Sequence, residues 1–191
     1  MASNRERALE AAVELIGTHG IRSLTHLRVD ERAGLSRGST SNHFRTRAAL
    51  LHGVVDHMVE REGPLVDTTF APASVDELVD ALVELFEHLT GPNRTMTTAR
   101  LALLVEASHD PDLRAALAEG RTRLEQTIVP ALAAFGAADP RLVAESLAVC
   151  FEGLFLHRLA RHAHVDPRPV LDLVVRAGLA TQASSASTST S

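Results

Sequence analysis

A short polar and basic segment, residues 35–51 (LSRGSTSNHFRTRAALL), carries side chains whose chemistry suits the recognition of nucleic acid. Arg37 could donate two hydrogen bonds to the O6 and N7 atoms of guanine, or pair with a phosphate. Thr40 and Asn42 are short polar groups that can reach base edges, and the methyl group of Thr40 could contact the methyl group of thymine. The segment predicts hydrogen-bonded recognition of DNA.

The ten histidines of the chain raise a second possibility, a metal site. Glu106 and His109 have the Glu-x-x-His spacing of helical di-iron sites, but such sites need two of these motifs and two further Glu residues. The sequence contains the motif once. His157 and His162 are five residues apart, so they do not share a helix face, and His164 follows two residues later. We therefore expect no metal, no cofactor and no enzymatic activity; a helical metal-dependent enzyme is the less favoured alternative.

The composition favours one globular protein, or two small domains, in a reducing compartment. The chain has 191 residues, of which 45% are hydrophobic and only 3% aromatic, so aliphatic side chains must build its core. Its one cysteine, Cys150, cannot form an intrachain disulfide and fits the cytoplasm. Charges interrupt the N-terminal segment and the longest apolar stretches. We therefore expect no signal peptide, no membrane span and no membrane partner.

The charges are distributed unevenly along the chain. Residues 1–50 contain eight Arg and five acidic residues, whereas residues 51–191 contain eleven Arg and nineteen acidic residues. A basic front on an acidic body suggests that the front meets an anion. A chance fluctuation of a few charges is the alternative, and the charges alone do not decide between the two.

Hydrophobic residues recur at helical spacing along the whole chain, beginning with a first helix that Gly20 can end. Thr25 and Ser36 predict N-caps for two short helices, which Gly34 separates. Thr46 predicts the start of a long fourth helix, which Gly63-Pro64 should kink or end. No segment alternates like a strand, so we expect an all-α protein of about nine helices. The later helices are expected at about 74–90, 93–109, 112–136, 139–163 and 167–180.

Two short helices joined by a glycine turn, the second of them polar and basic, form a helix-turn-helix. In this motif the second helix enters the major groove of DNA by its N-terminal end. Phe44 is expected to complete a small core beneath it with Leu9, Val13, Ile16, Val29 and Leu50. We expect a three-helix DNA-binding domain at 1–50, a larger helical domain at 51–180 and a disordered Ser/Thr-rich tail at 181–191.

The segment at residues 20–51 (GIRSLTHLRVDERAGLSRGSTSNHFRTRAALL) resembles the DNA-binding domain of the tetracycline-repressor (TetR) family. The resemblance includes the sequence ERAGLSRG, an aromatic residue at Phe44, a basic residue at Arg47 and the Ala-Leu-Leu start of the fourth helix. The chain departs from the family pattern at Thr40-Ser41, where Leu-Tyr is usual, and at His43, where Tyr is frequent.

The docking geometry of the motif and the resemblance together predict the DNA contacts. The second helix should meet bases, with Gly38 and Ser39 allowing close approach of the backbone, and its flanking residues should meet phosphates. His43 could replace a phosphate contact of the family's tyrosine. The expected DNA-binding residues are Thr25, Arg28, Ser36, Arg37, Gly38, Ser39, Thr40, Asn42, His43, Arg45 and Arg47.

If the resemblance holds, the larger domain dimerises and binds a ligand. The last two helices carry wide apolar faces that could pack with their two-fold mates as a four-helix bundle, although burial within one chain is the alternative. The expected dimer-interface residues are Leu147, Phe151, Leu154, Leu159, Leu171, Val174 and Val175. The resemblance also implies a ligand pocket, for which the candidate residues are Phe86, Met96, Arg100, Leu103, Glu106, Phe151 and Phe155.

These expectations describe a cytoplasmic, homodimeric transcriptional regulator that binds a near-palindromic DNA operator and responds to a small-molecule effector. The expectation that it represses transcription rests on the habit of the family. A helical adaptor that binds protein through its helix-turn-helix is the alternative from another class. The Arg-rich, aromatic-poor segment argues against the adaptor, and a steep loss of binding with salt would favour DNA.

Overall fold

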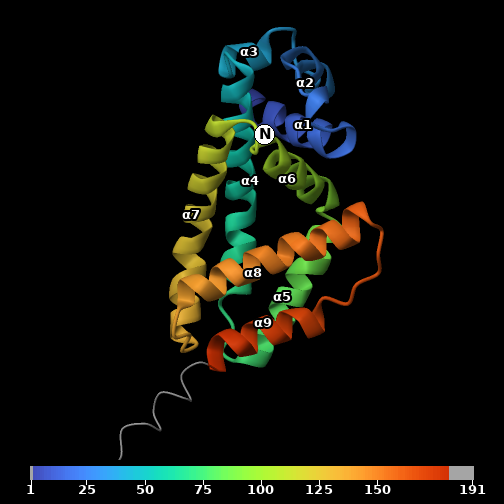
Figure 1. Ribbon diagram of the computed structural model, residues 1–191. Helices are drawn as coiled ribbons and strands as arrows, with labels where there is room; N and C mark the ends of the chain where they lie inside the picture. The colour runs from blue at the N-terminus through green and yellow to red at the C-terminus, as the bar shows by residue number, and fades with distance from the viewer. Residues whose placement is uncertain (1, 181–191) are drawn as a thin grey trace, which may run out of the picture. The chain divides into compact units, whose positions relative to one another are not determined.

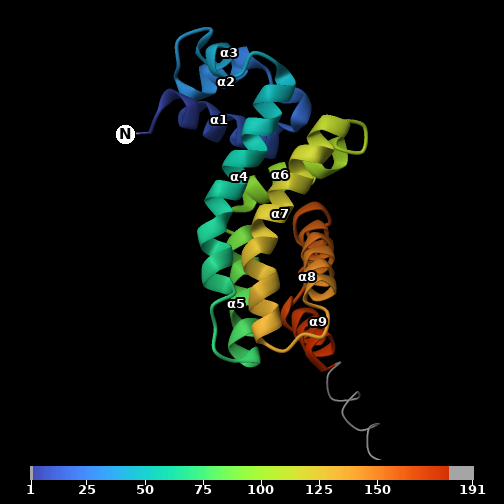
Figure 2. The ribbon, with the colours of Figure 1, turned by 90° about the vertical axis from the view of Figure 1, so that its left-hand side faces the viewer.

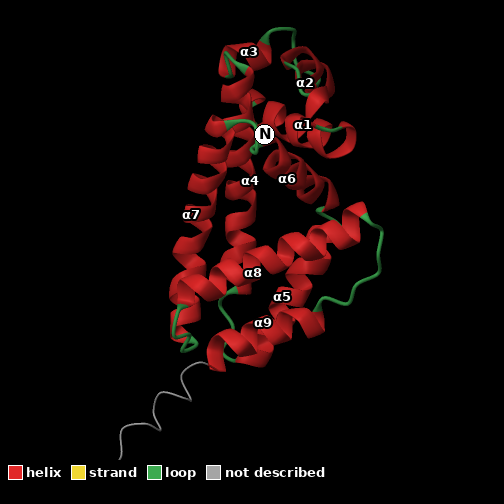
Figure 3. Ribbon diagram, in the orientation of Figure 1, coloured by secondary structure: helices red, strands yellow, loops and turns green. Residues whose placement is uncertain are grey.

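A computed structural model describes residues 2–180 of the chain. Within these residues the chain forms nine α-helices and no strand, as Figure 1 and Figure 3 show. The predicted all-α fold is therefore confirmed. The tail predicted at residues 181–191 lies outside the described residues. In the part of the chain that is described, no helix is long and apolar enough to cross a membrane.

The chain divides into two compact units. The N-terminal unit comprises the residues up to Glu62 together with Asn93–Thr122, and the C-terminal unit comprises Gly63–Pro92 and the residues from Arg123 onward. The first unit thus takes in more of the chain than the division at residue 50 expected from the sequence. The N-terminal unit contains α1 (Asn4–His19), a 3-10 turn (Ile21–Ser23), α2 (His26–Ala33), α3 (Ser39–His43), α6 (Arg94–Glu106) and parts of α4 (Arg47–Thr69) and α7 (Pro111–Ala134).

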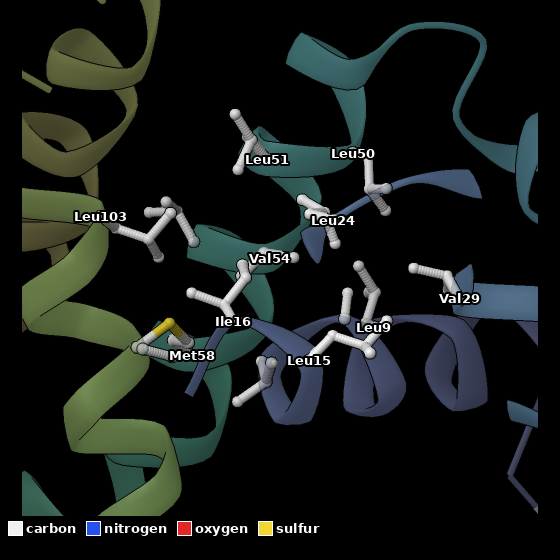
Figure 4. Close-up of a cluster of buried hydrophobic side chains, with 14 of the residues drawn as sticks. Leu9, Leu15, Ile16, Leu24, Val29, Leu50, Leu51, Val54, Met58 and Leu103 are labelled. Carbon is white, nitrogen blue, oxygen red and sulfur yellow. The ribbon is translucent and has the colours of Figure 1, made fainter. Parts of the chain in front are cut away.

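Aliphatic side chains fill the core of the N-terminal unit (Figure 4). Leu9 and Ile16 of α1 are buried there with Val54 and Met58 of α4 and Leu103 of α6. The core predicted around Phe44 is confirmed, because all six of its members are buried in this cluster: Leu9, Val13, Ile16, Val29, Phe44 and Leu50.

Close packing of α1 against α6 explains why α6 belongs to the N-terminal unit (Figure 2). Gly17 of α1 lies so near Thr95 of α6 that an added Cβ would be 2.2 Å from the backbone oxygen of Thr95. Only a glycine permits this approach of the two backbones. α6 thus packs on α1, the helix against which α2 and α3 are packed.

Local signals determine where several helices begin and end. Thr25 accepts a hydrogen bond from the backbone N–H of Arg28, and Thr46 accepts one from that of Ala49, so both predicted N-caps are confirmed. Gly63-Pro64, which was predicted to kink or end the fourth helix, does not end it, because α4 continues to Thr69. Burial of apolar side chains along α4 outweighs the local cost of a proline within it.

The C-terminal unit contains α5 (Val75–Thr90), α8 (Pro140–Phe155), a π-helical turn (Leu156–Ala160) and α9 (Arg168–Ala180), with α9 packed against α5 and α8 (Figure 2). Phe86, Phe151 and Phe155 contact one another, with ring centroids 5.6–6.3 Å apart. The Arg158 guanidinium lies 4.9 Å from the centroid of the Phe86 ring and makes two hydrogen bonds to Glu87. An aromatic cluster with a cation on one ring thus forms part of this unit's core.

His57 of α4 is buried, and we expect it to make the protein less stable in mild acid. Burial lowers the pKa of His57, and the nearby Arg61 and Arg5 lower it further, against the opposite effects of Glu10 and Glu60. Because the unfolded chain then takes up a proton that the folded chain does not, the free energy of unfolding should fall as the pH drops below about 6.5. Urea titrations at pH 7.5 and 5.5 would measure this fall.

The His57→Gln variant should lose less stability between these two pH values than the wild type, whatever its stability at pH 7.5. His109 is exposed, so the matched His109→Gln variant should keep the wild-type pH dependence. Equal pH dependence in all three proteins would contradict a role for His57.

Candidate nucleic-acid interface

The helix-turn-helix is formed by α2 and α3 of the N-terminal unit (Figure 1). Gly34 ends α2 in the left-handed conformation, with φ 62° and ψ 36°. The chain then turns, and α3 begins at Ser39 after Gly38, whose φ is 92°. The predicted N-cap at Ser36 is therefore wrong by two residues, because Gly38 is the residue that precedes the helix.

The buried carboxylate of Asp30, on α2, holds the first residues of α3. It accepts hydrogen bonds from the backbone N–H of Gly38 at 2.7 Å, from that of Thr40 at 2.8 Å and from the Thr40 hydroxyl at 2.6 Å. Burial disfavours the charged form of Asp30, but the hydrogen bonds from Thr40 and Gly38 outweigh that effect, and the pKa of Asp30 is lowered. The sequence analysis did not identify Asp30, since no local pattern reveals the partner of a buried carboxylate.

Thr40 differs from the other predicted contacts in that its side chain is fully buried, with an exposed fraction of 0%. Its hydroxyl is bonded to Asp30 and is directed into the unit. The expectation that Thr40 contacts base edges is therefore corrected, because a buried hydroxyl that already donates to a carboxylate does not present a surface to DNA. Thr40 positions its helix instead.

The remaining predicted residues are exposed or half-buried, and lie at the start of α2, in the turn, on α3 and around the start of α4. Arg47 is partly engaged within the unit, since its guanidinium donates to the backbone oxygen of Ile21 at 3.2 Å and lies 4.0 Å from Glu106. Gly38 and Ser39 are half-buried. The exposed members are Thr25, Arg28, Ser36, Arg37, Asn42, His43, Arg45 and Arg47.

Two further side chains brace this surface from within the unit. His26 of α2 lies 2.6 Å, through its Nε2 atom, from the backbone oxygen of Phe44, directly after α3. Arg7 of α1 donates to the backbone oxygens of Ala33 and Gly34, at the end of α2. Hydrogen bonds therefore tie the turn of the motif to α1 and the end of α3 to α2.

The seven candidate pocket residues fall into separate groups. Met96 and Leu103 are buried in the core of the N-terminal unit. In the same unit Arg100 of α6 forms an ion pair with the buried Glu62 of α4. Glu106 is near Arg47, as described above. The other three, Phe86, Phe151 and Phe155, form the aromatic cluster of the C-terminal unit. The pocket itself stays a prediction.

The predicted dimer residues mostly lie on the inner face of α8 and α9. Six of the seven are buried within a single chain, and Val174 alone is half-buried. The prediction is corrected in this respect. An apolar helix face indicates that the face is buried, but not whether its own chain or a partner chain covers it. The same two helices expose other large apolar side chains: Leu142 and Val149 of α8, Leu156 at its end, and Val170 and Leu173 of α9.

Comparison with known proteins gives a consistent result for the whole chain. The family model for bacterial regulatory proteins of the tetR family matches residues 8–54. The family model for the tetracyclin repressor-like C-terminal domain matches residues 73–181, which is more than half of the chain. The first match contains all of the helix-turn-helix.

Individual relatives agree with the family models. The HTH-type transcriptional regulator BetI of Yersinia pestis is 23% identical over 177 residues, covering 89% of this chain and 88% of its own. A TetR-family member of Streptomyces coelicolor A3 is 25% identical, with a TM-score of 0.71 and coverage of 92% and 98%. The multidrug binding protein EbrR, solved with imidazole, is 25% identical, with a TM-score of 0.70 and coverage of 92% and 95%.

The fold, the exposed polar surface on a helix-turn-helix and the two family models agree. The chain belongs to the TetR family of bacterial regulatory proteins and is a DNA-binding transcriptional regulator.

Proposed function

We propose that the protein is a homodimeric, cytoplasmic repressor that binds a near-palindromic operator and is released by a small molecule, without enzymatic activity. The observation that carries the proposal is the exposed polar surface of the turn and α3, above all Arg37 and Asn42. Arg can form a bidentate pair with guanine, and Asn can do so with adenine. A five-residue helix that exposes such groups suits insertion into the major groove.

A dimer would place two such helices on successive turns of DNA, about 34–36 Å apart. We place its interface on the exposed apolar side chains of α8 and α9. Leu142, Val149 and Leu156 follow one another at seven-residue spacing, which puts them on the same side of a helix. Gly153 and Ser146 lie between them, so small residues would allow a second copy to approach closely.

The ligand response is proposed from the TetR family, whose members are typically released from DNA by small ligands. We propose that a ligand acts on α4, which begins at Arg47, shortly after the end of α3 at His43, and carries Glu62 in its second half. The ion pair of Glu62 with Arg100 links α4 to α6. A ligand that rearranges this pair would shift α4 and thereby change the presentation of α3. A coupling of about 1–3 kcal/mol would lower operator affinity by roughly 5–150-fold.

DNA binding by the purified protein tests the proposal. Duplexes selected from a random library should bind far more tightly than competitor DNA, and affinity should fall steeply with salt. Arg37→Ala and Asn42→Ala should each cost about 1–3 kcal/mol of specific binding. Arg32, which is exposed on α2 but paired with Glu14 of α1, supplies the control: Arg32→Ala removes one positive charge from the same unit.

Equal, weak binding of wild type and variants to every duplex would contradict sequence-specific recognition. Absence of binding at any salt concentration, in a folded protein, would favour the adaptor alternative. Among the described residues, no group of three or more His, Cys, Asp or Glu side chains is placed to hold a metal ion.

A further inference from the structure

The recognition helix α3 is too short to determine its own orientation. It has five residues, and the only side chain that it buries is that of Thr40. Isolated helices shorter than about 12–15 residues are marginal in water, and a five-residue helix has few contacts of its own. What holds α3 on the N-terminal unit must therefore come from outside the helix.

The start of α3 is fixed by Asp30, which has an exposed fraction of 2%. A single buried carboxylate receives two backbone N–H groups and one hydroxyl group, from Gly38 and Thr40. Because Thr40 is held by both its N–H and its hydroxyl, the rotation of α3 about its own axis is fixed as well as its position. That rotation decides in which direction the exposed Asn42 and His43 point.

The end of α3 is also fixed by a side chain of α2, that of His26. His26 precedes Asp30 by four residues, so the two side chains leave α2 on the same face. A backbone carbonyl can only accept a hydrogen bond, so the Nε2 atom of His26 donates to the oxygen of Phe44. One face of α2 thus binds both ends of α3.

We propose that Asp30, Thr40 and His26 are positioning residues that set the operator specificity of this protein without touching DNA. The inference rests on the proposed function. Removal of one of these hydrogen bonds would leave the exposed contact residues in place but allow α3 to rotate. Hydrogen bonds to base edges depend on the direction of the contacting side chains, so recognition of bases would be lost. The attraction between basic side chains and phosphates depends mainly on charge, so it would persist.

Two near-isosteric variants test the inference. Thr40→Val removes the hydroxyl, and Asp30→Asn removes the charge and one acceptor oxygen, while Thr40→Ser keeps the hydroxyl and serves as the rescue control. Each protein is titrated with the duplex that the wild type selects from a random library, with duplexes that carry single base-pair changes, and at several salt concentrations. Thermal unfolding and hydrogen exchange of the Gly38 and Thr40 amides are measured in parallel.

We expect Thr40→Val and Asp30→Asn to lower affinity for the selected duplex about tenfold or more, the effect of a lost hydrogen bond to a charged group. The variants should discriminate less between the selected duplex and duplexes with altered base pairs. The slope of log affinity against log salt concentration should stay that of the wild type. The amides of residues 38 and 40 should exchange faster with solvent. Thr40→Ser should bind like the wild type. The effects of Thr40→Val and Asp30→Asn should be less than additive in the double variant, since both residues belong to one hydrogen-bond network.

Folded variants that discriminate base pairs as well as the wild type does would overturn the inference, even if they unfold at lower temperature. So would a salt slope lowered by about one, because it would indicate a direct phosphate contact. A wild-type protein that selects no duplex would overturn the proposed function itself, and the inference with it; the wild-type titration separates that failure from a failure confined to the variants.

Discussion

Val149→Glu and Leu173→Glu should each convert the proposed dimer into monomers. Val149 of α8 and Leu173 of α9 are 61% and 69% exposed in the single chain, which are large values for apolar side chains. In a four-helix bundle of two chains these side chains would be covered, and a glutamate in their place would be a buried charge without a partner. Sedimentation or light scattering would measure the dissociation.

Loss of the dimer should weaken operator binding by roughly 100-fold or more, because the second half-site would no longer be bound by a linked partner. Val105→Glu is the matched control. Val105 of α6 is 70% exposed, about as exposed as Val149, but lies in the N-terminal unit and outside the proposed interface. A Val149→Glu protein that stays dimeric would contradict the proposed interface, and a Val105→Glu protein that becomes monomeric would place the interface elsewhere.

The corrected dimer residues show what an apolar helix pattern can and cannot predict. The segment from Pro140 to Phe155 carries apolar residues on more than one side, of which Leu147 is buried and Leu142 and Val149 are exposed. The pattern does not say which side faces its own chain. Packing of α9 on α8 decides this, with Gly178 lying against Val143, and it turns Leu147 inward and Val149 outward.

Helix boundaries could be predicted where the signal is local. A threonine before a helix and a glycine after it act through atoms within four residues, and Thr25, Gly34 and Thr46 behave as expected. The start of α3 could not be predicted in this way. Asp30 lies eight residues before Gly38 and binds its N–H group across the turn, so the cap of α3 belongs to another helix.

The absence of a local signal also explains why Thr40, which is buried, was predicted to contact DNA. Its neighbours in sequence are polar and mostly exposed, and nothing local distinguishes it from Asn42. A hydroxyl can read a base or bind a buried carboxylate equally well. The departure from the usual leucine at this position is the one signal that could have indicated a role in the interior, since Thr40 occupies a position that is apolar in the family pattern.

The second large effect concerns the ion pair between α4 and α6. Glu62 is 5% exposed, and its carboxylate is paired with the partly exposed guanidinium of Arg100. Arg100→Met should leave the carboxylate buried without its counter-ion, and the free energy of unfolding should fall by about 3–5 kcal/mol. For a chain of this length the midpoint of thermal unfolding should drop by roughly 10 °C.

Glu62→Gln should cost less than Arg100→Met, because the guanidinium that it leaves behind is closer to water. The double variant Glu62→Met with Arg100→Met should recover most of the stability, since two apolar side chains of similar volume replace the pair without burying a charge. A double variant as unstable as Arg100→Met alone would show that packing, and not the charge, is responsible.

The dependence on pH distinguishes an unpaired carboxylate from a simple loss of contacts. In the Arg100→Met protein, lowering the pH from 7.5 to 5 should reduce the deficit relative to the wild type, because protonation neutralises the buried carboxyl group. A deficit that stays constant over this range would indicate lost packing of the arginine stem instead. The double variant, which carries no charge at either position, should show no such recovery. A further outcome concerns the ligand response. If the double variant is as stable as the wild type and binds the operator, but is not released by a ligand that releases the wild type, the Glu62–Arg100 ion pair serves the ligand response and not the fold.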